Sequence, residues 1–139
     1  MKKKTLIIGV LILILISACS KAEEQHKFDE EKLINLSLEL VSEANKANSQ
    51  PIYDLVTESY RKTTTVEEVN EFISFQLSMA INYDSIIKTT FSQSVHPLDK
   101  YPIGSVVVLA RFENGTMTYT FNYNELNEIL GFSMNFQLK

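Results

Sequence analysis

Residues 105–123 read SVVVLARFENGTMTYTFNY, a run in which apolar and polar residues alternate on both sides of Asn114-Gly115. A period of two residues is that of a β-strand with one buried face. Asn-Gly between two such runs is a strong signal for a two-residue type I′ turn. The sequence therefore predicts a β-hairpin. The apolar residues expected to face each other across it are Phe112 with Met117, Ala110 with Tyr119, Val108 with Phe121, and Val106 with Tyr123.

The opposite side of this hairpin is less polar than a solvated sheet requires. Val107 and Leu109 place branched apolar side chains among Thr118 and Thr120. Two alternatives to a functional role are open. Single apolar side chains are common on protein surfaces and need no explanation, or the C-terminal residues cover these two. A threonine-rich face with a small apolar centre also suits a modest interface. These four residues form the candidate interface.

Two further strands flank the hairpin. The helical period changes to a period of two at Tyr83, and alternation resumes after a turn at residues 124–127. The sequence thus predicts a four-stranded antiparallel sheet with one apolar face. Its inward residues are expected to be Ile87, Thr89, Phe91 and Val95 in the first strand, and Leu130, Phe132, Met134, Phe136 and Leu138 in the fourth.

Three helices are predicted before the sheet. Asp29 is an N-cap, Pro51 suits the first turn of a helix, and Thr65 with Glu68 has the spacing of a capping box. Apolar residues recur every three or four positions after each start. Because the helices precede a sheet with one apolar face, we expect an α+β fold in which they cover that face. The predicted helices are Glu30 to about Asn48, Pro51 to about Tyr60, and Val66 to about Asn82.

The first residues have the parts of a secretion signal. Residues 2–4 are lysines, residues 5–16 are apolar, and two small residues precede Cys19, the only cysteine. The stretch Ile16-Ser17-Ala18-Cys19 resembles the lipobox of bacterial lipoproteins. That resemblance implies cleavage before Cys19 and a diacylglyceryl group on its thiol, which would hold the chain on the outer face of the cell membrane.

Two other interpretations of the apolar segment are open. A permanent transmembrane anchor is one, although twelve helical residues reach about 18 Å of a hydrocarbon core about 30 Å thick. Conventional cleavage is the other, although it needs a small residue where Ile16 stands. We expect a removed signal at 1–18, the lipidated cysteine and a polar tether at 19–27, and a single domain at 28–139.

The charge of the chain disfavours some partners. The net charge is −4, and removal of the signal, which carries three lysines and no acid, changes it to −7. Phosphate backbones and anionic headgroups would repel so acidic a protein. Nucleic acid is therefore not an expected partner, and attachment to the membrane is expected through the lipid on Cys19.

Four motifs belong to one pattern that runs from Phe28 to Lys139: PIYDL at 51–55, TVEE at 65–68, YTFNY at 119–123 and ILGF at 129–132. This pattern resembles a nuclear transport factor two-like domain, in the small form found as lipoproteins of low-GC Gram-positive bacteria. The resemblance implies a curved sheet that closes with the helices into a cone. Asn82 and Asn127 stand where glycine is common, and asparagine tolerates the left-handed conformation needed there. The loop 61–65 is too short for the hairpin that the commonest version inserts.

In some members of that family the cone is a catalytic pocket lined by carboxylates or histidines. Here Tyr119 and Tyr123 are the expected inward polar groups and form the candidate pocket, while His26 lies in the tether and His96 on the polar side of a strand. The sequence has no His/Cys cluster, glycine-rich phosphate loop or nucleophile elbow, so no metal or cofactor is expected. We expect a non-enzymatic domain that binds an envelope protein or a small apolar ligand. An isomerase or dehydratase and a structural, self-associating domain remain alternatives.

Overall fold

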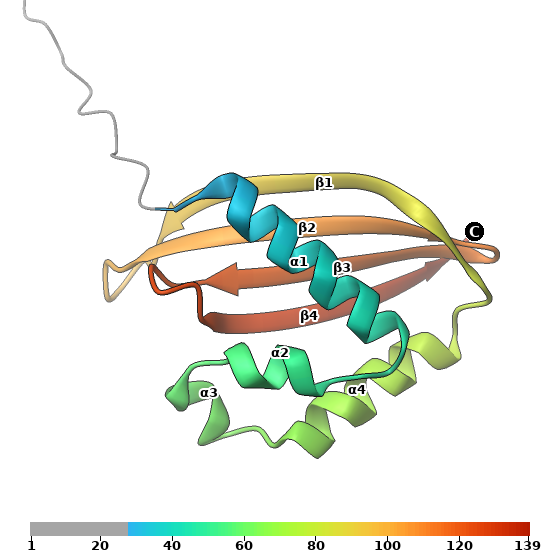
Figure 1. Ribbon diagram of the computed structural model, residues 1–139, viewed down its shortest axis with the longest axis horizontal. Coiled ribbons are helices and arrows are strands. Elements are labelled where there is room, and N and C mark those ends of the chain that lie inside the picture. The colour runs from blue at the N-terminus through green and yellow to red at the C-terminus, as the bar shows by residue number, and fades with distance from the viewer. Residues whose placement is uncertain (1–27) are drawn as a thin grey trace, which may run out of the picture.

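The computed structural model describes residues 28–139. Within them, four helices precede four antiparallel strands that lie in the order β1-β2-β3-β4. The helix α1 crosses one face of the sheet, and α2, α3 and α4 lie on its β4 side (Figure 1). No helix in this part of the chain is long and apolar enough to span a bilayer. The elements are α1 (Glu30–Asn45), α2 (Gln50–Leu55), α3 (Glu58–Arg61), α4 (Val66–Ser78), β1 (Tyr83–Val95), β2 (Pro102–Phe112), β3 (Gly115–Tyr123) and β4 (Ile129–Leu138).

The predicted starts of the first and third helices are confirmed, whereas the second helix begins at Gln50, one residue before the predicted Pro51. The Asp29 carboxylate accepts a hydrogen bond from the Lys32 amide at 3.0 Å. Thr65 and Glu68 form the reciprocal capping box, with each side chain accepting from the other's backbone N–H. The Asp29 cap and the Thr65–Glu68 capping box each satisfy amides that would otherwise lack a partner at a helix start.

The predicted ends of the first and third helices lie too far along the chain. The helix α1 ends at Asn45 because Ala47 takes a φ of 56°, and the amides that follow fold back onto the carbonyls of Glu43 and Ala44. The helix α4 ends at Ser78, and Asn82 adopts a φ of 36° before the sheet begins. Asn127 has a φ of 62°, so both asparagines occupy the left-handed region as expected.

The prediction of a single second helix is wrong. The chain leaves the helix at Val56, which makes a parallel bridge to Ile129, and the Thr57 amide donates to the Ile129 carbonyl at 3.0 Å. Thr57 then caps α3 by accepting from the Tyr60 amide at 3.3 Å. The helix is interrupted because backbone groups at Val56 and Thr57 pair with Ile129 at the start of β4 and not with the preceding helical turn. The described residues therefore form four helices, where three were predicted.

The two faces of the central hairpin were predicted correctly, but its turn was not. The turn residues are Glu113 and Asn114, and Phe112 pairs with Gly115. Every pair is therefore displaced by two residues from the predicted register. Because side chains alternate with a period of two, a shift of two leaves the same residues on each face. The observed inward pairs are Ala110 with Met117, Val108 with Tyr119, and Val106 with Phe121.

Asn114 and Gly115 serve other purposes than a type I′ turn. Gly115 does not have a positive φ. A Cβ placed there would lie 2.8 Å from Cζ of Phe136 and closer still to the backbone oxygen of Gln137. The Asn114 side chain accepts from the Ile81 amide at 2.8 Å and donates to the Met79 carbonyl at 2.9 Å, so it holds the end of α4.

The flanking strands carry two irregularities that their alternation does not show. Pairing of β1 shifts between Ile86 and Lys88, so Ile86 faces inward and the predicted inward residue Ile87 is exposed. Pairing of β4 shifts beside Tyr123, and Ile129 is buried at the start of the strand instead of Leu130. Val95 and Leu138, at the strand ends, are also exposed, against expectation. Thr89, Phe91, Phe132, Met134 and Phe136 face inward as predicted.

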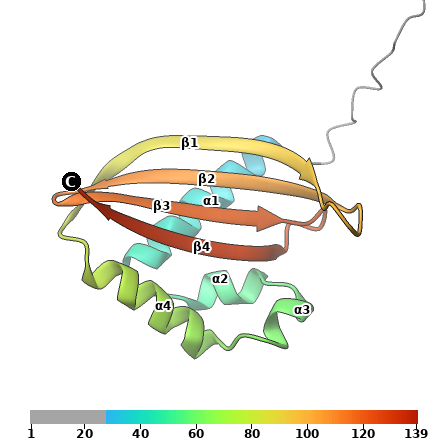
Figure 2. The ribbon, with the colours of Figure 1, turned by 180° about the vertical axis from the view of Figure 1, so that it is seen from behind.

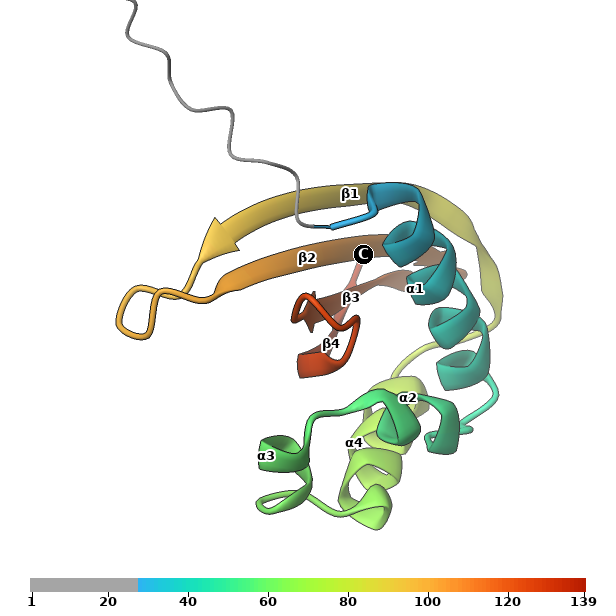
Figure 3. The ribbon, with the colours of Figure 1, turned by 60° about the vertical axis from the view of Figure 1, so that its left-hand side comes forward.

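The core lies between the sheet and the helices. It is built from the inward side of β2 and β3 and the apolar stripes of α1, α2 and α4. Seen from behind, the sheet lies in front of α1 and none of the four helices crosses its other face (Figure 2). A third view shows the curvature of the sheet around the helical layer (Figure 3).

Candidate interaction face

The candidate pocket residues Tyr119 and Tyr123 are fully buried on the inner face of the sheet. The Tyr119 hydroxyl donates to the side-chain oxygen of Asn45, and the hydroxyls of Tyr123 and Ser37 are 2.8 Å apart. Both partners belong to α1. A ligand that contacted either tyrosine would therefore have to displace a helix side chain that is already bonded to it.

Burial also suppresses acid-base chemistry at these hydroxyls. Desolvation raises the pKa of Tyr123 to about 12, with the Ser37 hydrogen bond acting weakly in the opposite direction. Desolvation, with a smaller contribution from Tyr83, raises the pKa of Tyr119 as well. Both hydroxyls are protonated at neutral pH. Among residues 28–139, no buried side-chain nitrogen or oxygen lacks a hydrogen-bond partner.

The outer face of the sheet places the four candidate interface residues side by side. Leu109 pairs with Thr118 and Val107 pairs with Thr120 across the β2–β3 ladder. All four are half-buried, because side chains of the adjacent strands flank them. The central patch is thus two aliphatic side chains next to two threonines, as predicted.

Polar residues, most of them uncharged, extend this patch to both edges of the sheet. The register puts Thr90 beside Val107 and Lys88 beside Leu109 in β1, and small polar side chains beside both threonines in β4. One cross-strand bond is visible, from the Ser105 hydroxyl to the Asn122 side-chain oxygen at 2.7 Å. We define the outer face as Lys88, Thr90, Ser92, Ser105, Val107, Leu109, Arg111, Thr116, Thr118, Thr120, Asn122, Ser133, Asn135 and Gln137.

The electrostatics of the outer face differ from those of the whole chain. Its only charged members are Lys88 and Arg111, whereas the chain has a net charge of −4. Hydroxyl and amide groups dominate the rest. Such a surface desolvates at lower cost than a charged one, and its donors and acceptors can pair with another polar surface.

The remaining polar candidates lie elsewhere. His96 stacks on Tyr101 with ring centroids 4.6 Å apart and lies 3.2 Å from the Asp99 carboxylate, on the hairpin between β1 and β2. Within residues 28–139 no group of His, Cys, Asp and Glu is placed to hold a metal ion. Cys19 and His26 lie outside the described residues.

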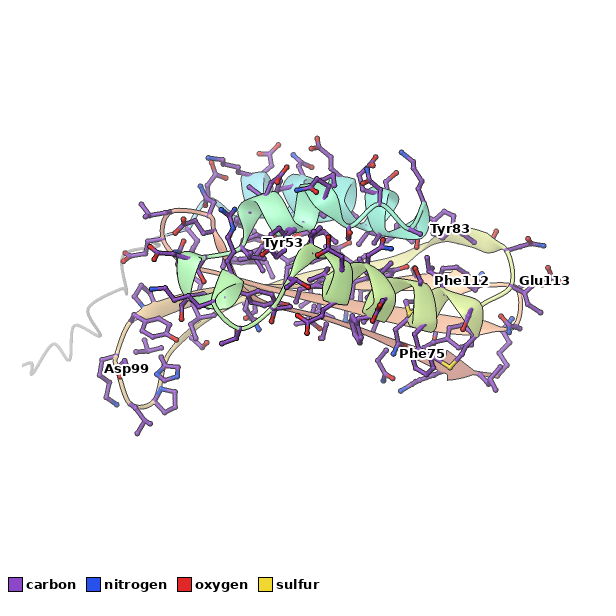
Figure 4. All side chains as sticks on the ribbon, turned by 90° about the horizontal axis from the view of Figure 1, so that it is seen from below. Tyr53, Phe75, Tyr83, Asp99, Phe112 and Glu113 are labelled. Carbon is purple, nitrogen blue, oxygen red and sulfur yellow. The ribbon has the colours of Figure 1, made fainter. Side chains whose placement is uncertain are left out.

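Sequence reasoning missed several residues that shape these surfaces. Asn45 and Ser37 were not foreseen as partners of the tyrosines, although Ser37 lies on the apolar stripe of α1, which is a signal for a buried hydroxyl. Phe72, Phe75 and Met79 are exposed and form an apolar stripe along α4 and its C-cap. Phe75 is 62% exposed, and Figure 4 shows it on the outside of that helix.

Comparison with known proteins identifies this arrangement of helices and strands in a solved structure. No protein-family model and no curated protein matches the chain. The NMR structure of a protein from Ruminococcus gnavus ATCC 29149 is similar, with a TM-score of 0.64 over 78% of this chain and 93% of that one. Sequence identity is 19%, so the likeness shows the fold alone. The chain is an α+β protein with helices before a curved four-stranded antiparallel sheet.

Proposed function

We propose that this chain is an extracytoplasmic lipoprotein, anchored through Cys19, whose nuclear transport factor two-like domain binds another envelope protein through the outer face. The observation that carries the proposal is the outer face itself. None of the four described helices covers it, it holds two half-buried aliphatic side chains, and only two of its residues are charged.

The inner side of the sheet supports a binding role over a chemical one. Isomerases and dehydratases with this kind of cone need a polar group that an entering substrate can reach. The hydroxyls of Tyr119 and Tyr123 are instead bonded to α1 and buried. The same packing disfavours a small apolar ligand in the cone, because large side chains of the core already occupy the inner face of β3.

The anchor is tested by replacing the only cysteine. The wild-type protein should incorporate labelled palmitate and partition into detergent, while Cys19→Ser should lose the label and remain an uncleaved or soluble precursor. Equal membrane retention of an unlabelled Cys19→Ser protein would show that the apolar segment is itself the anchor.

The outer face is tested by changing its apolar centre. In gently solubilised membranes the wild-type protein should migrate in a complex larger than a single lipidated chain, and Val107→Lys with Leu109→Glu should reduce it to the size of the single chain. The matched control, Phe75→Lys with Leu138→Glu, introduces the same charges at exposed apolar residues away from the outer face. Far-UV circular dichroism checks that both variants fold.

The outcomes separate the interpretations. A complex of twice the chain's mass would indicate self-association through the same face. A wild-type protein that runs alone, or a control variant that dissociates the complex while the outer-face variant does not, would contradict the assignment of this face.

A further inference from the structure

The described chain starts at one particular end of the sheet. The Phe28 ring lies over Gly104, so close that a Cβ on that glycine would be 2.9 Å from the ring. Gly104 is in the first part of β2, directly after the hairpin that joins β1 to β2. The start of the domain is therefore at the base of the β1–β2 hairpin, which projects beyond the end of the sheet (Figure 3).

The tip of that hairpin is apolar and solvent-exposed. Leu98 is 82% exposed, more than any other large hydrophobic residue from Phe28 to Lys139, and Val95 and Tyr101 are exposed beside it. Leu126, 77% exposed, lies in the β3–β4 turn at the same end of the meander. Figure 4 places Asp99, at this tip, at the opposite end of the molecule from Glu113.

The backbone of the tip is largely satisfied from within. The His96 amide donates to the Tyr101 carbonyl at 2.8 Å, and the Lys100 amide donates to the His96 carbonyl at 3.0 Å. The Asp99 amide donates to Nδ1 of His96 at 3.2 Å, and Pro97 has no N–H to satisfy. Backbone N–H and C=O groups that are hydrogen-bonded within a loop lower the free-energy cost of transferring that loop from water to a membrane.

The tether limits how far this end can stand from the lipid. From Cys19 to Lys27 there are nine residues, which reach at most about 30 Å when fully extended. The 13 residues of β1 give the sheet a length of about 40 Å. The end that carries Phe28 and the hairpin is thus the end that the anchor holds toward the bilayer.

We propose that the tip of the β1–β2 hairpin inserts Leu98 into the outer leaflet of the membrane that holds the acylated Cys19. This inference rests on the lipid anchor of the proposed function. Leu98 would enter the acyl boundary, while the stacked rings of His96 and Tyr101 would lie at the headgroup level that amphipathic rings favour. Asp99 and Lys100 are neighbours of opposite charge, so apolar contact and not net charge drives the insertion. Insertion would also fix the direction in which the outer face points from the membrane.

The chain has no tryptophan, which allows a direct test. The full-length lipidated protein with Leu98→Trp is reconstituted into phosphatidylcholine–phosphatidylglycerol vesicles, with and without brominated acyl chains. We expect a blue-shifted tryptophan emission that the brominated lipid quenches at least twofold. The matched control is Leu138→Trp, since Leu138 is 73% exposed at the other end of the sheet. Its emission should stay that of a water-exposed indole and should not be quenched.

The outcomes distinguish this inference from the anchor it depends on. Palmitate incorporation and vesicle flotation are measured on the same sample. Lipidated, floating protein whose Leu98→Trp emission is neither shifted nor quenched overturns the hairpin inference alone. A blue shift without quenching by brominated lipid also overturns it, because the indole would then be buried against protein and not in the acyl chains. Loss of lipidation in the wild type overturns the proposed anchor.

Discussion

Gly115 offers the sharpest test of the packing between β3 and β4. An alanine Cβ there would lie 2.8 Å from Cζ of Phe136 and closer to the Gln137 backbone oxygen. The backbone atom cannot rotate away, so the two strands must separate locally. Overpacking of this kind costs about 1–3 kcal/mol. At about 4 °C per kcal/mol for a domain of this size, Gly115→Ala should lower the thermal midpoint by about 4–12 °C, and Gly115→Val by more.

Two other strand glycines serve as matched controls. At Gly131 the nearest atom to an added Cβ is Nδ2 of Asn122 at 3.6 Å, an ordinary contact. Gly131→Ala should therefore be neutral, or stabilising by up to about 1 kcal/mol through the unfolded state. Gly104→Ala should be intermediate, because the obstructing atoms belong to the movable Phe28 ring. Thermal and urea unfolding followed by circular dichroism measure all three. Equal midpoints for Gly115→Ala and Gly131→Ala would refute the reasoning.

Three further substitutions test individual contacts. Asn114→Ala should cost about 1–2 kcal/mol in urea unfolding, because two backbone groups at the end of α4 lose their partner. Tyr123→Phe should cost about 1–2 kcal/mol at neutral pH by leaving the Ser37 hydroxyl unpaired. Because burial raises the pKa of Tyr123 to about 12, the folded state favours its protonated hydroxyl. This contribution to stability is complete below about pH 10, where the unfolded chain is also protonated, and it is lost as the pH rises to about 12, so the variant should lose less stability over that range. Gln76→Ala should speed hydrogen exchange at the Phe136 amide, which donates to the Gln76 side chain at 3.1 Å on the sheet edge, and unchanged exchange would contradict that protection.

Much of the fold is predictable because its signals are local. The alternation in residues 105–123 specifies which side chains face inward even when the turn is placed wrongly. A shift of two residues in the strand register leaves the same side chains on each face. The side chains of Asp29 and Thr65 accept hydrogen bonds from amides three residues further along the chain, so these caps can be predicted from the local sequence. The outer-face candidates Val107 and Leu109 follow from the same alternation.

The errors come from contacts between distant segments. Asn114-Gly115 has the composition of a type I′ turn. In the structure, however, the Asn114 side chain accepts a hydrogen bond from the Ile81 amide just after α4, and the missing side chain of Gly115 leaves room for the backbone of β4. Neither contact can be inferred from the hairpin sequence. The break at Val56 depends on Ile129, more than seventy positions away. Exposed Leu98 lies in a loop, where no periodicity indicates which side faces water.

The central claim is that the outer face contacts another envelope component, and photo-crosslinking in intact cells tests it most directly. The lipidated protein carries p-benzoylphenylalanine at Thr118, on the outer face, or at Glu71, on the exposed side of α4. We predict a discrete adduct from Thr118 that is absent from Glu71 and is lost when Val107→Lys and Leu109→Glu are added. No adduct from Thr118, or the same adducts from both positions, would contradict the claim.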